Sequence, residues 1–396
     1  MPKPLHKTRF NRPLTGLLAV WIGGMGMASQ AQTNFPQFSV HTIDHIGSKM
    51  GQTALVDVDQ DGDLDWIVGE ANHSQSRIWW WEYREPEAWI RHFLGKGNTD
   101  VGGTAHDLNG DGWVDVYSGS KILINTGRPH TESFKEYDVG AIASHDSELA
   151  DINGDGQLDG LANSDKAGLY WYEIPADPTR AWKAHLIVSA QTHQIHGGVS
   201  PKAAGDMDGD GDCDVVTGQA WYENTDGRGL KWTAHRNIAF GEKHQYGIAL
   251  KTWVIDLDGD GDLDVVQAEA DHPDGRVAWF ENDGHGNWTC FIIKDKGDHQ
   301  DFHTLIVADF DGDGDADVFS GGGPLSAKDS HTCYIWENMA GPYGRPTTKH
   351  WVEHIVARKP CHEAVAGDVD GDGDIDICTK PWSTGNEHIY LRNLSQ

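Results

Sequence analysis

The sequence predicts an all-β fold, a seven-bladed β-propeller with four antiparallel strands per blade, over residues 32–396. Two observations predict it. An acidic motif begins at residues 57, 107, 151, 206, 256, 309 and 368, so it recurs every 44 to 59 residues, a period typical of propeller blades. Short apolar runs flank each copy, a pattern typical of strands. Helical periodicity of any length is absent.

Each repeat supplies its strands in a fixed order. An apolar strand precedes the acidic motif and another follows it. A third, aromatic strand covers residues 78–82, 121–125, 169–173, 220–224, 277–281, 334–338 and 389–393. The fourth reads aromatic-x-x-His, as in Trp89-Ile-Arg-His92, with looser copies beginning at Phe134 and Trp288.

The two ends of the chain complement each other. A copy of the fourth strand, Phe38-Ser-Val-His41, precedes the first acidic motif, whereas the last repeat stops after its third strand. The N-terminal strand is therefore expected to complete the last blade, which leaves no open sheet edge in the ring.

Residues 1–31 differ from the rest of the chain. Four basic residues precede an apolar run from Leu14 to about Met27, and small residues end the segment at Ala31. This order is typical of a secretory signal peptide cleaved near Ala31, which predicts a secreted or periplasmic protein. A retained membrane anchor is the alternative, but the run is short for a membrane span.

The charge of the chain restricts its partners. It has 396 residues with 31 Lys and Arg against 61 Asp and Glu, a formal net charge of −30. A nucleic-acid partner is not expected, because such binding requires a positive surface. No membrane span is expected after residue 31. The oligomeric state stays open.

The acidic motifs predict calcium loops. Oxygen ligands stand at positions 1, 3, 5, 7 (through the carbonyl) and 9, with Gly at position 6 for the turn, and this spacing suits Ca²⁺. The EF-hand Glu at position 12 is absent, so we expect several structural Ca²⁺ ions in strand-to-strand loops. The alternative is that some loops are only Asp-Gly turns.

The predicted ligands are, loop by loop, Asp57, Asp59, Asp61, Asp63 and Asp65; Asp107, Asn109, Asp111, Trp113 and Asp115; Asp151, Asn153, Asp155, Gln157 and Asp159; Asp206, Asp208, Asp210, Asp212 and Asp214; Asp256, Asp258, Asp260, Asp262 and Asp264; Asp309, Asp311, Asp313, Asp315 and Asp317; and Asp368, Asp370, Asp372, Asp374 and Asp376.

The motif D-x-D-x-D-G-x-x-D followed by an apolar strand resembles the FG-GAP, or VCBS, repeat of integrin α-subunits and secreted bacterial proteins. The Trp-rich strands and the run from His362 to Asp368 are similar to the sugar-processing branch. That branch includes the propeller of aldos-2-ulose dehydratase and some polysaccharide lyases. The resemblance implies a propeller and a carbohydrate ligand or substrate.

A site is expected where the chain enters each inner strand, on the face opposite the acidic loops. His145, His303 and His362 stand six residues before the first Asp of their loops, where the other repeats have Gly, Val, Ser or Leu. Lys202 and Lys251 stand in similar places. We predict these five as the catalytic residues, with His303 and His362 as acid and base candidates and the lysines as charge stabilisers.

Neighbouring residues are predicted to bind the substrate. They are Asp146, His196, His244, Tyr246, Glu269, Arg276, Glu363, Lys380 and Trp382. Convergent His, Lys and carboxylate groups can abstract a proton and stabilise an enolate. This chemistry predicts a lyase or dehydratase that performs β-elimination on an acidic or oxidised sugar.

Several alternatives remain open at this level. The pocket can belong to a non-catalytic module that binds a glycan or protein. The three histidines can be packing residues, as the repeated His41, His92, His185, His235 and His354 are expected to be. The central histidines can hold a transition metal, although no spacing proves it. Cys361, beside His362, is a further nucleophile candidate, and a disulfide among Cys333, Cys361 and Cys378 is an open pairing.

Overall fold

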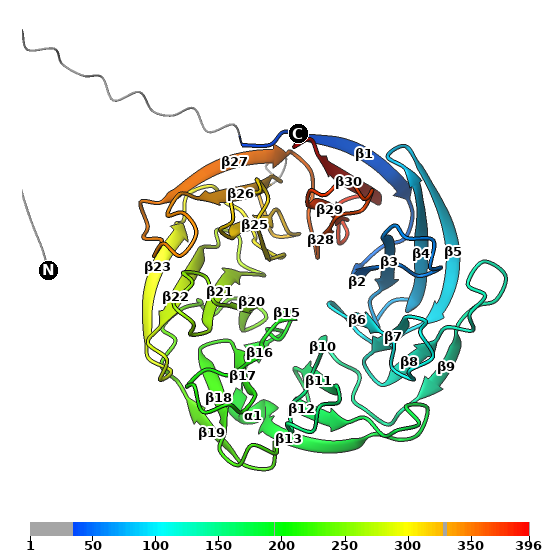
Figure 1. The fold of residues 1–396 in the computed structure, drawn as a ribbon, viewed down its shortest axis with the longest axis horizontal. Helices are drawn as coiled ribbons and strands as arrows, with labels where there is room; N and C mark the ends of the chain where they lie inside the picture. The colour runs from blue at the N-terminus through cyan, green and yellow to red at the C-terminus, as the bar shows by residue number, and fades with distance from the viewer. Residues whose placement is uncertain (1–34, 194, 328–330, 396) are drawn as a thin grey trace, which may run out of the picture. The chain divides into compact units, whose positions relative to one another are not determined.

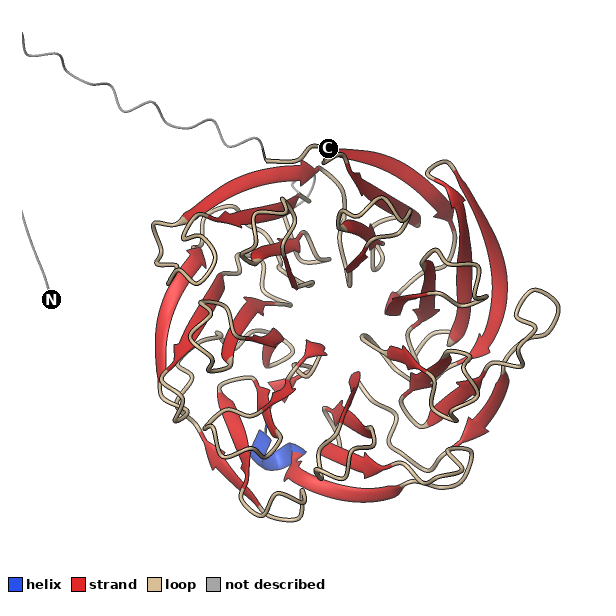
Figure 2. Cartoon of the chain, in the orientation of Figure 1, coloured by secondary structure: helices blue, strands red, loops and turns tan. Residues whose placement is uncertain are grey.

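The computed structural model describes residues 35–193, 195–327 and 331–395. Seven sheets stand around a common axis in this part of the chain (Figure 1). Strands and loops form nearly all of it, and its one described helix is the single turn α1 (Ala190–His193) (Figure 2). The predicted propeller is confirmed. The predicted signal peptide, residues 1–31, lies outside the described residues.

The first four blades follow the chain in order, each starting from its inner strand. Blade 1 contains β2 (Met50–Val56), β3 (Asp65–Glu70), β4 (Arg77–Glu85) and β5 (Ala88–Lys96); blade 2 contains β6 (Thr104–His106), β7 (Asp115–Ser118), β8 (Lys121–Ile124) and β9 (Lys135–Asp138). Blade 3 contains β10 (Asp146–Ala150), β11 (Asp159–Ser164), β12 (Gly168–Glu173) and β13 (Lys183–Ser189); blade 4 contains β16 (Ala204–Gly205), β17 (Asp214–Thr217), β18 (Ala220–Asn224) and β19 (Trp232–His235).

The remaining blades complete the ring. Blade 5 contains β20 (Ile248–Ile255), β21 (Asp264–Glu269), β22 (Val277–Asn282) and β23 (Trp288–Lys294); blade 6 contains β24 (Ile306–Ala308), β25 (Asp317–Gly321), β26 (Cys333–Asn338) and β27 (Trp351–Ala357). Blade 7 contains β28 (Val365–Gly367), β29 (Asp376–Thr379) and β30 (Glu387–Asn393), and its outer strand is β1 (Phe38–His45). β1 pairs antiparallel with β30, Phe38 opposite Asn393, as predicted from the chain ends.

Blade 5 carries an addition that the repeats did not predict. Two short strands, β14 (Ile195–His196) and β15 (Pro201–Lys202), leave the connection between blades 3 and 4 and pair parallel with β20. Because β20 is the inner strand of its blade, this pairing brings His196 to the ring axis.

The ninth residue of each acidic loop fastens the loop to its blade. In blade 5, Asp264 Oδ2 accepts a hydrogen bond from the Leu257 backbone N–H at 3.0 Å, and Oδ1 accepts one from Asn282 at 2.9 Å. Asn282 Nδ2 in turn donates to the Met207 carbonyl of blade 4 at 2.8 Å. Buried carboxylates and amides thus pair backbone groups that the loop would leave unsatisfied.

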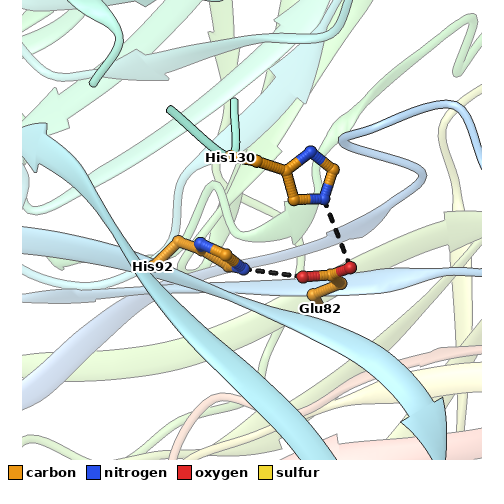
Figure 3. Close-up of side chains that lie close together, drawn as sticks. All are labelled: Glu82, His92 and His130. Carbon is orange, nitrogen blue, oxygen red and sulfur yellow. Dashed lines mark hydrogen bonds and ion pairs between the residues drawn. The ribbon is translucent and has the colours of Figure 1, made fainter. Parts of the chain in front are cut away.

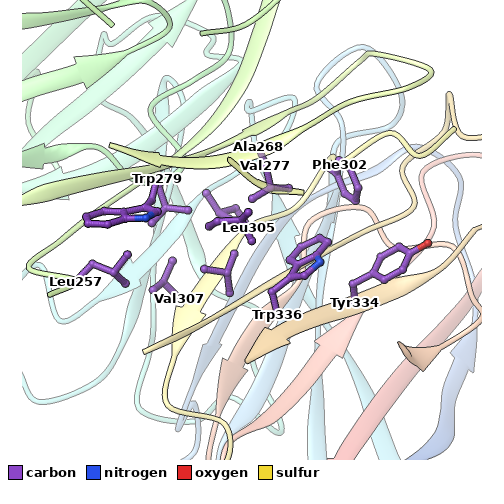
Figure 4. Close-up of a cluster of buried hydrophobic side chains, with 12 residues drawn as sticks. Leu257, Ala268, Val277, Trp279, Phe302, Leu305, Val307, Tyr334 and Trp336 are labelled. Atoms are coloured by element: carbon purple, nitrogen blue, oxygen red, sulfur yellow. The ribbon is translucent and has the colours of Figure 1, made fainter. Parts of the chain in front are cut away.

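Apolar side chains fill the space between neighbouring blades. Between blades 5 and 6, Trp279 and Trp336 are at most 1% exposed and pack in one cluster with Leu305 and Phe302 (Figure 4). Burying one such side chain contributes about 1.5–3 kcal/mol, so these seams hold the ring together. None of the described helices is long and apolar enough to cross a membrane.

Candidate functional site

The two ends of the inner strands carry different residues. β10 is preceded directly by His145 and followed by the acidic loop 151–159. His303 and His362 likewise precede β24 and β28, whose far ends lead into loops 309–317 and 368–376. Acidic loops and these histidines therefore lie at opposite ends of the same strands, as the sequence predicted.

A pocket of about 380 Å³ lies where these histidines meet. Its lining includes His145, His196, His303 and His362 together with Asp271, Tyr246 and Trp382. These residues come from four blades and from the β14 segment, so the ring closure itself assembles the pocket. Six of the fourteen predicted catalytic and binding residues line it.

One half of the pocket is a row of imidazoles and carboxylates. His145 Nε2 lies 3.1 Å from His196 Nε2, and His196 Nε2 lies 3.3 Å from Asp271 Oδ2. The same Asp271 oxygen lies 3.5 Å from His303 Nε2. The opposite ring nitrogens of His145 and His196 contact Asp146 Oδ1 at 2.6 Å and Asp165 Oδ2 at 2.5 Å.

The other half stacks aromatic rings. The His362 ring lies against that of His303, with centroids 4.1 Å apart, and its other neighbour is Trp382 at 4.7 Å. His362 is 2% exposed, and its Nδ1 has no hydrogen-bond partner among the described residues. The Trp382 indole also contacts His73, and Lys49 completes this side of the pocket.

A buried ion pair supports the histidines from behind. Lys251 Nζ pairs with Glu363 Oε1, and the same carboxylate oxygen lies 3.4 Å from His303 Nδ1. Asp146 also attracts the Lys251 ammonium. This charge balance allows two cationic groups and two carboxylates to stand almost completely buried.

The environment separates the protonation states of the imidazoles. Burial alone would lower the pKa of His303, but the Asp271 and Glu363 carboxylates outweigh it and raise this pKa to about 10. Burial is likewise outweighed at His196, where Asp165 and Asp271 raise the pKa to about 9. At His362, burial and the nearby His303 and Lys380 charges hold the pKa well below its usual range. One pocket therefore holds a neutral ring beside charged ones.

Several predicted residues lie elsewhere. Lys202 lines the central channel instead, a hollow of about 450 Å³. Lys251 is absent from the pocket lining and lies behind it. The Lys380 ammonium donates to the carbonyls of His362 and Glu363, and burial lowers its pKa to about 7. The sequence predicts Lys202 and Lys251 as charge stabilisers and Lys380 as a substrate-binding residue, whereas the structure places all three outside the pocket.

Three further predicted residues, Glu269, Arg276 and His244, lie in blade 5 or just before it and do not line the pocket. Arg276 donates two hydrogen bonds to the Glu269 carboxylate, at 2.8 and 2.9 Å. The same pair recurs in blade 1 as Arg77 and Glu70, so it is a repeat feature that fixes the connection between two strands. His244 contacts the His272 ring and does not line the pocket. Asp146 and Glu363 do not line the pocket, and they contact its histidines His145 and His303.

Sequence reasoning missed Asp271, Lys49, His73 and Asp100 of the pocket wall. Asp271 has a signal in retrospect, because it follows β21 by two residues in the connection that reaches this face. Its backbone is left-handed, with φ 52°, and this turn aims the side chain at His196 and His303.

The cysteines lie outside the pocket lining. All five are free, so no disulfide joins Cys333, Cys361 and Cys378 in this structure. Cys361, the nucleophile candidate, is fully buried, with Sγ 3.1 Å from Thr379 Oγ1.

Another His-carboxylate cluster contains Glu82, His92 and His130 (Figure 3). Its His92 Nε2 lies 2.7 Å from Glu82 Oε2, and the His92 ring stacks on Trp80 at 4.3 Å. The same His-Glu contact recurs at His235 and Glu223, 2.6 Å apart. The repeated histidines of the outer strands are therefore packing residues, as the sequence indicated.

The acidic loops present carboxylates in the expected arrangement. Three oxygens from Asp57, Asp59 and Asp61 lie within 4.8 Å of one another, and the corresponding groups of blades 4 and 5 do the same. Asp63 Oδ1 and Asp208 Oδ1 are buried without a hydrogen-bond partner among the described residues. The ninth position differs from expectation, since both oxygens of Asp264 already accept backbone N–H groups.

A larger hollow, of about 640 Å³, lies between the acidic loops of blades 2 and 3. It is lined by loop residues such as Asp107 and Asp155 and by Glu173. Its carboxylates are those of the repeated loops, whereas the 380 Å³ pocket gathers residues that only some of the repeats carry. We therefore take the smaller pocket as the candidate site.

Comparison with known proteins supports the fold. Residues 57–118 and 256–320 match the FG-GAP-like repeat, so the chain carries FG-GAP-like repeats. No curated protein matches the chain. Among solved structures, BBS1N in complex with ARL6DN is similar at 10% identity and TM-score 0.53, over 90% of this chain and 96% of that one. At this identity the likeness shows the propeller fold alone.

Two further structures are similar at lower scores. The V. cholerae biofilm matrix protein Bap1 has 13% identity and TM-score 0.48, over 90% of each chain. The rhamnogalacturonan lyase YesW has 13% identity and TM-score 0.43, over 89% of this chain and 75% of that one.

Proposed function

We propose that this protein is a carbohydrate-active lyase or dehydratase that performs β-elimination on an acidic or oxidised sugar in the 380 Å³ pocket. One observation carries the proposal. A buried imidazole with an unpartnered nitrogen, His362, stacks between a carboxylate-paired imidazole, His303, and an indole, Trp382. A base, an acid and a sugar platform are thereby neighbours.

The proposed roles follow from these contacts. The sugar ring lies on the Trp382 face, because indoles stack well on the apolar side of a sugar. His362 Nδ1 takes the proton from the carbon next to the carboxylate or ketone, and that C–H electron pair becomes the new C=C bond. The C–O bond to the leaving group breaks, and the leaving oxygen takes a proton from His303.

The surrounding charges hold this pair in place. Glu363 and Asp271 contact the two ring nitrogens of His303, which keeps it protonated and oriented. Lys251 balances Glu363 from behind. In this proposal His196 and Tyr246, whose rings stack at 5.4 Å, bound the far side of the substrate.

The test is an elimination assay on the mature protein with uronate polysaccharides and keto-sugars, following ultraviolet absorbance of the unsaturated product. We expect product from at least one substrate class, and loss of turnover in Trp382→Ala through weaker binding. His244→Ala is the matched control, since His244 lies outside the pocket. Absence of product across the panel, with glycan binding retained, would replace this proposal with a non-catalytic binding module.

We further propose that the acidic loops hold structural Ca²⁺ and that the protein is exported. The partnerless buried oxygens of Asp63 and Asp208 support calcium, because hard oxygen ligands suit this ion. In this proposal Asp264 and its equivalents mainly hydrogen-bond the loop to its blade. Export rests on the sequence of residues 1–31 and is tested by N-terminal sequencing of the protein recovered from its native host.

A further inference from the structure

Four donor atoms form a row in the pocket. The gaps are 3.1 Å from His145 Nε2 to His196 Nε2, 3.3 Å from there to Asp271 Oδ2, and 3.5 Å from Asp271 Oδ2 to His303 Nε2. Ligands about 2.0–2.1 Å from a tetrahedral Zn²⁺ stand about 3.3 Å apart. The two gaps at His196 Nε2, to His145 Nε2 and to Asp271 Oδ2, therefore match the spacing of neighbouring zinc ligands.

The far nitrogens of these rings are held by carboxylates. His145 Nδ1 contacts Asp146 Oδ1, and His196 Nδ1 contacts Asp165 Oδ2. Metal-bound histidines usually donate their other N–H to a carboxylate, which fixes the ring and its tautomer. With both Nδ1 atoms held by carboxylates, the two Nε2 atoms are the ones that remain to bind a metal ion.

The backbone is shaped to bring these groups together. A Cβ added to Gly197 would lie 2.9 Å from His145 Nδ1, and the Gly198 N–H donates to Asp146 Oδ2 at 2.6 Å. Asp271 is held in the left-handed region. Strain of this kind persists where surrounding contacts over-determine it, commonly at functional sites.

We propose that His145 Nε2, His196 Nε2 and Asp271 Oδ2 bind a divalent transition-metal ion, with Zn²⁺ as the best fit. Three protein ligands leave one position open toward the pocket, as in catalytic zinc sites. His303 remains on the other side of Asp271. This inference deepens the proposed function, because the open position faces the substrate, where an ion would hold its carboxylate or ketone oxygen.

The other His-carboxylate groups are poorer sites. Glu82, beside His92 and His130, already pairs with Arg84. Glu363, beside His303 and His362, already pairs with Lys251. In both groups a lysine or arginine side chain already occupies the carboxylate. Imidazole ligands also distinguish the proposed site from the acidic loops, which offer oxygen alone and suit Ca²⁺.

The experiment measures Zn²⁺ itself. Mature protein, stripped with chelator and returned to millimolar Ca²⁺ to fill the acidic loops, is titrated with Zn²⁺ by calorimetry and with Co²⁺ by visible absorption. We expect one tight Zn²⁺ per chain and a Co²⁺ spectrum with nitrogen ligation. His196→Ala removes both, and the surface-exposed Asp165→Asn weakens Zn²⁺ affinity about 10–100-fold. His92→Gln, in the cluster of Figure 3, leaves both unchanged.

Two results would overturn the site: wild type that holds less than a tenth of a Zn²⁺ per chain, or Asp165→Asn and His196→Ala that bind as wild type does. Asp165→Asn keeps the test decisive if His196→Ala fails to fold, since the Asp165 side chain is 43% exposed. Zn²⁺ binding without elimination on any sugar would contradict only the proposed function. Elimination by wild-type protein that binds no Zn²⁺ in the titration would contradict only the metal site.

Discussion

The ring of His362 lies against the ring of His303, with centroids 4.1 Å apart and planes 22° apart. The two residues belong to blades 7 and 6, so the contact forms only when the propeller folds. Of these two rings, only that of His303 has carboxylates at its nitrogens, those of Glu363 and Asp271. The pKa values of two identical side chains are thereby shifted in opposite directions a few ångströms apart.

Removing the Lys251 ammonium is expected to destabilise the protein. Lys251→Met leaves Glu363 buried without its ion-pair partner, which costs about 3–5 kcal/mol when one member of a buried pair is lost. Urea denaturation measures this cost. The double variant Lys251→Met with Glu363→Gln is expected to recover most of it. A single variant as stable as wild type would show that the pair is not a support of the pocket.

His388 is expected to make the protein acid-sensitive. Its ring contacts both Trp66 and Trp81, and burial lowers its pKa to about 3. Above about pH 6.5 the ring is neutral in both states and contributes nothing. Between pH 6.5 and about 3 only the unfolded state binds the proton, so stability falls by about 1.4 kcal/mol per pH unit.

The His388→Phe variant tests this assignment. It keeps an aromatic ring in contact with both tryptophans, but this ring cannot take up a proton. The difference in unfolding free energy between variant and wild type is expected to move in favour of the variant as pH falls from 6.5 to 4. A difference that stays constant over this range would show that His388 does not contribute to acid unfolding.

The hydrogen bonds by which Asp264 joins its loop to the blade predict a loss of stability on mutation that is independent of calcium. Asp264→Asn keeps one carbonyl acceptor and leaves either the Leu257 or the Asn282 N–H unpaired, at about 1–3 kcal/mol. Chemical denaturation in EGTA measures this loss without the ion. Asp262→Asn, at position 7 of the same loop, is the control and is expected to change stability by less than about 0.5 kcal/mol under these conditions. Equal effects of the two changes would argue against this role of the Asp264 hydrogen bonds.

Removal of calcium is expected to lower the unfolding temperature. One ion at a hundred times its Kd adds about 2.7 kcal/mol, and several loops share the arrangement seen at Asp57, Asp59 and Asp61. Differential scanning calorimetry with Ca²⁺, with EGTA, and with EGTA plus Mg²⁺ measures the shift. Only Ca²⁺ should restore the wild-type temperature. An unchanged transition in EGTA would favour loops that are simple Asp-Gly turns.

The fold was readable from the sequence because a propeller repeats its local signals. Each acidic loop, aromatic strand and aromatic-x-x-His strand identifies one part of a blade, and the surplus Phe38-Ser-Val-His41 strand identifies the closure. His145, His303 and His362 could be placed in one pocket for the same reason. Equal offsets from equivalent loops put them at equivalent points around the axis.

The rest of the site depends on side-chain direction, which the repeat does not encode. Lys251 stands five residues before its loop, within β20, and reaches Glu363 in the interior. Lys202 and His196 lie in two-residue strands too short to leave a periodic pattern. Asp271 reaches the pocket through a left-handed backbone turn at a non-glycine residue, a conformation that composition does not reveal.

The central claim is that His362 is the base of an elimination reaction in the axial pocket. The most direct measurement compares wild type, His362→Gln and the control His244→Ala, with substrate affinity and turnover determined on the same samples. The account predicts that His362→Gln binds substrate within a few-fold of wild type but loses turnover by about 10²–10⁴-fold, the usual contribution of a general base. Turnover in His362→Gln equal to that of His244→Ala would contradict it.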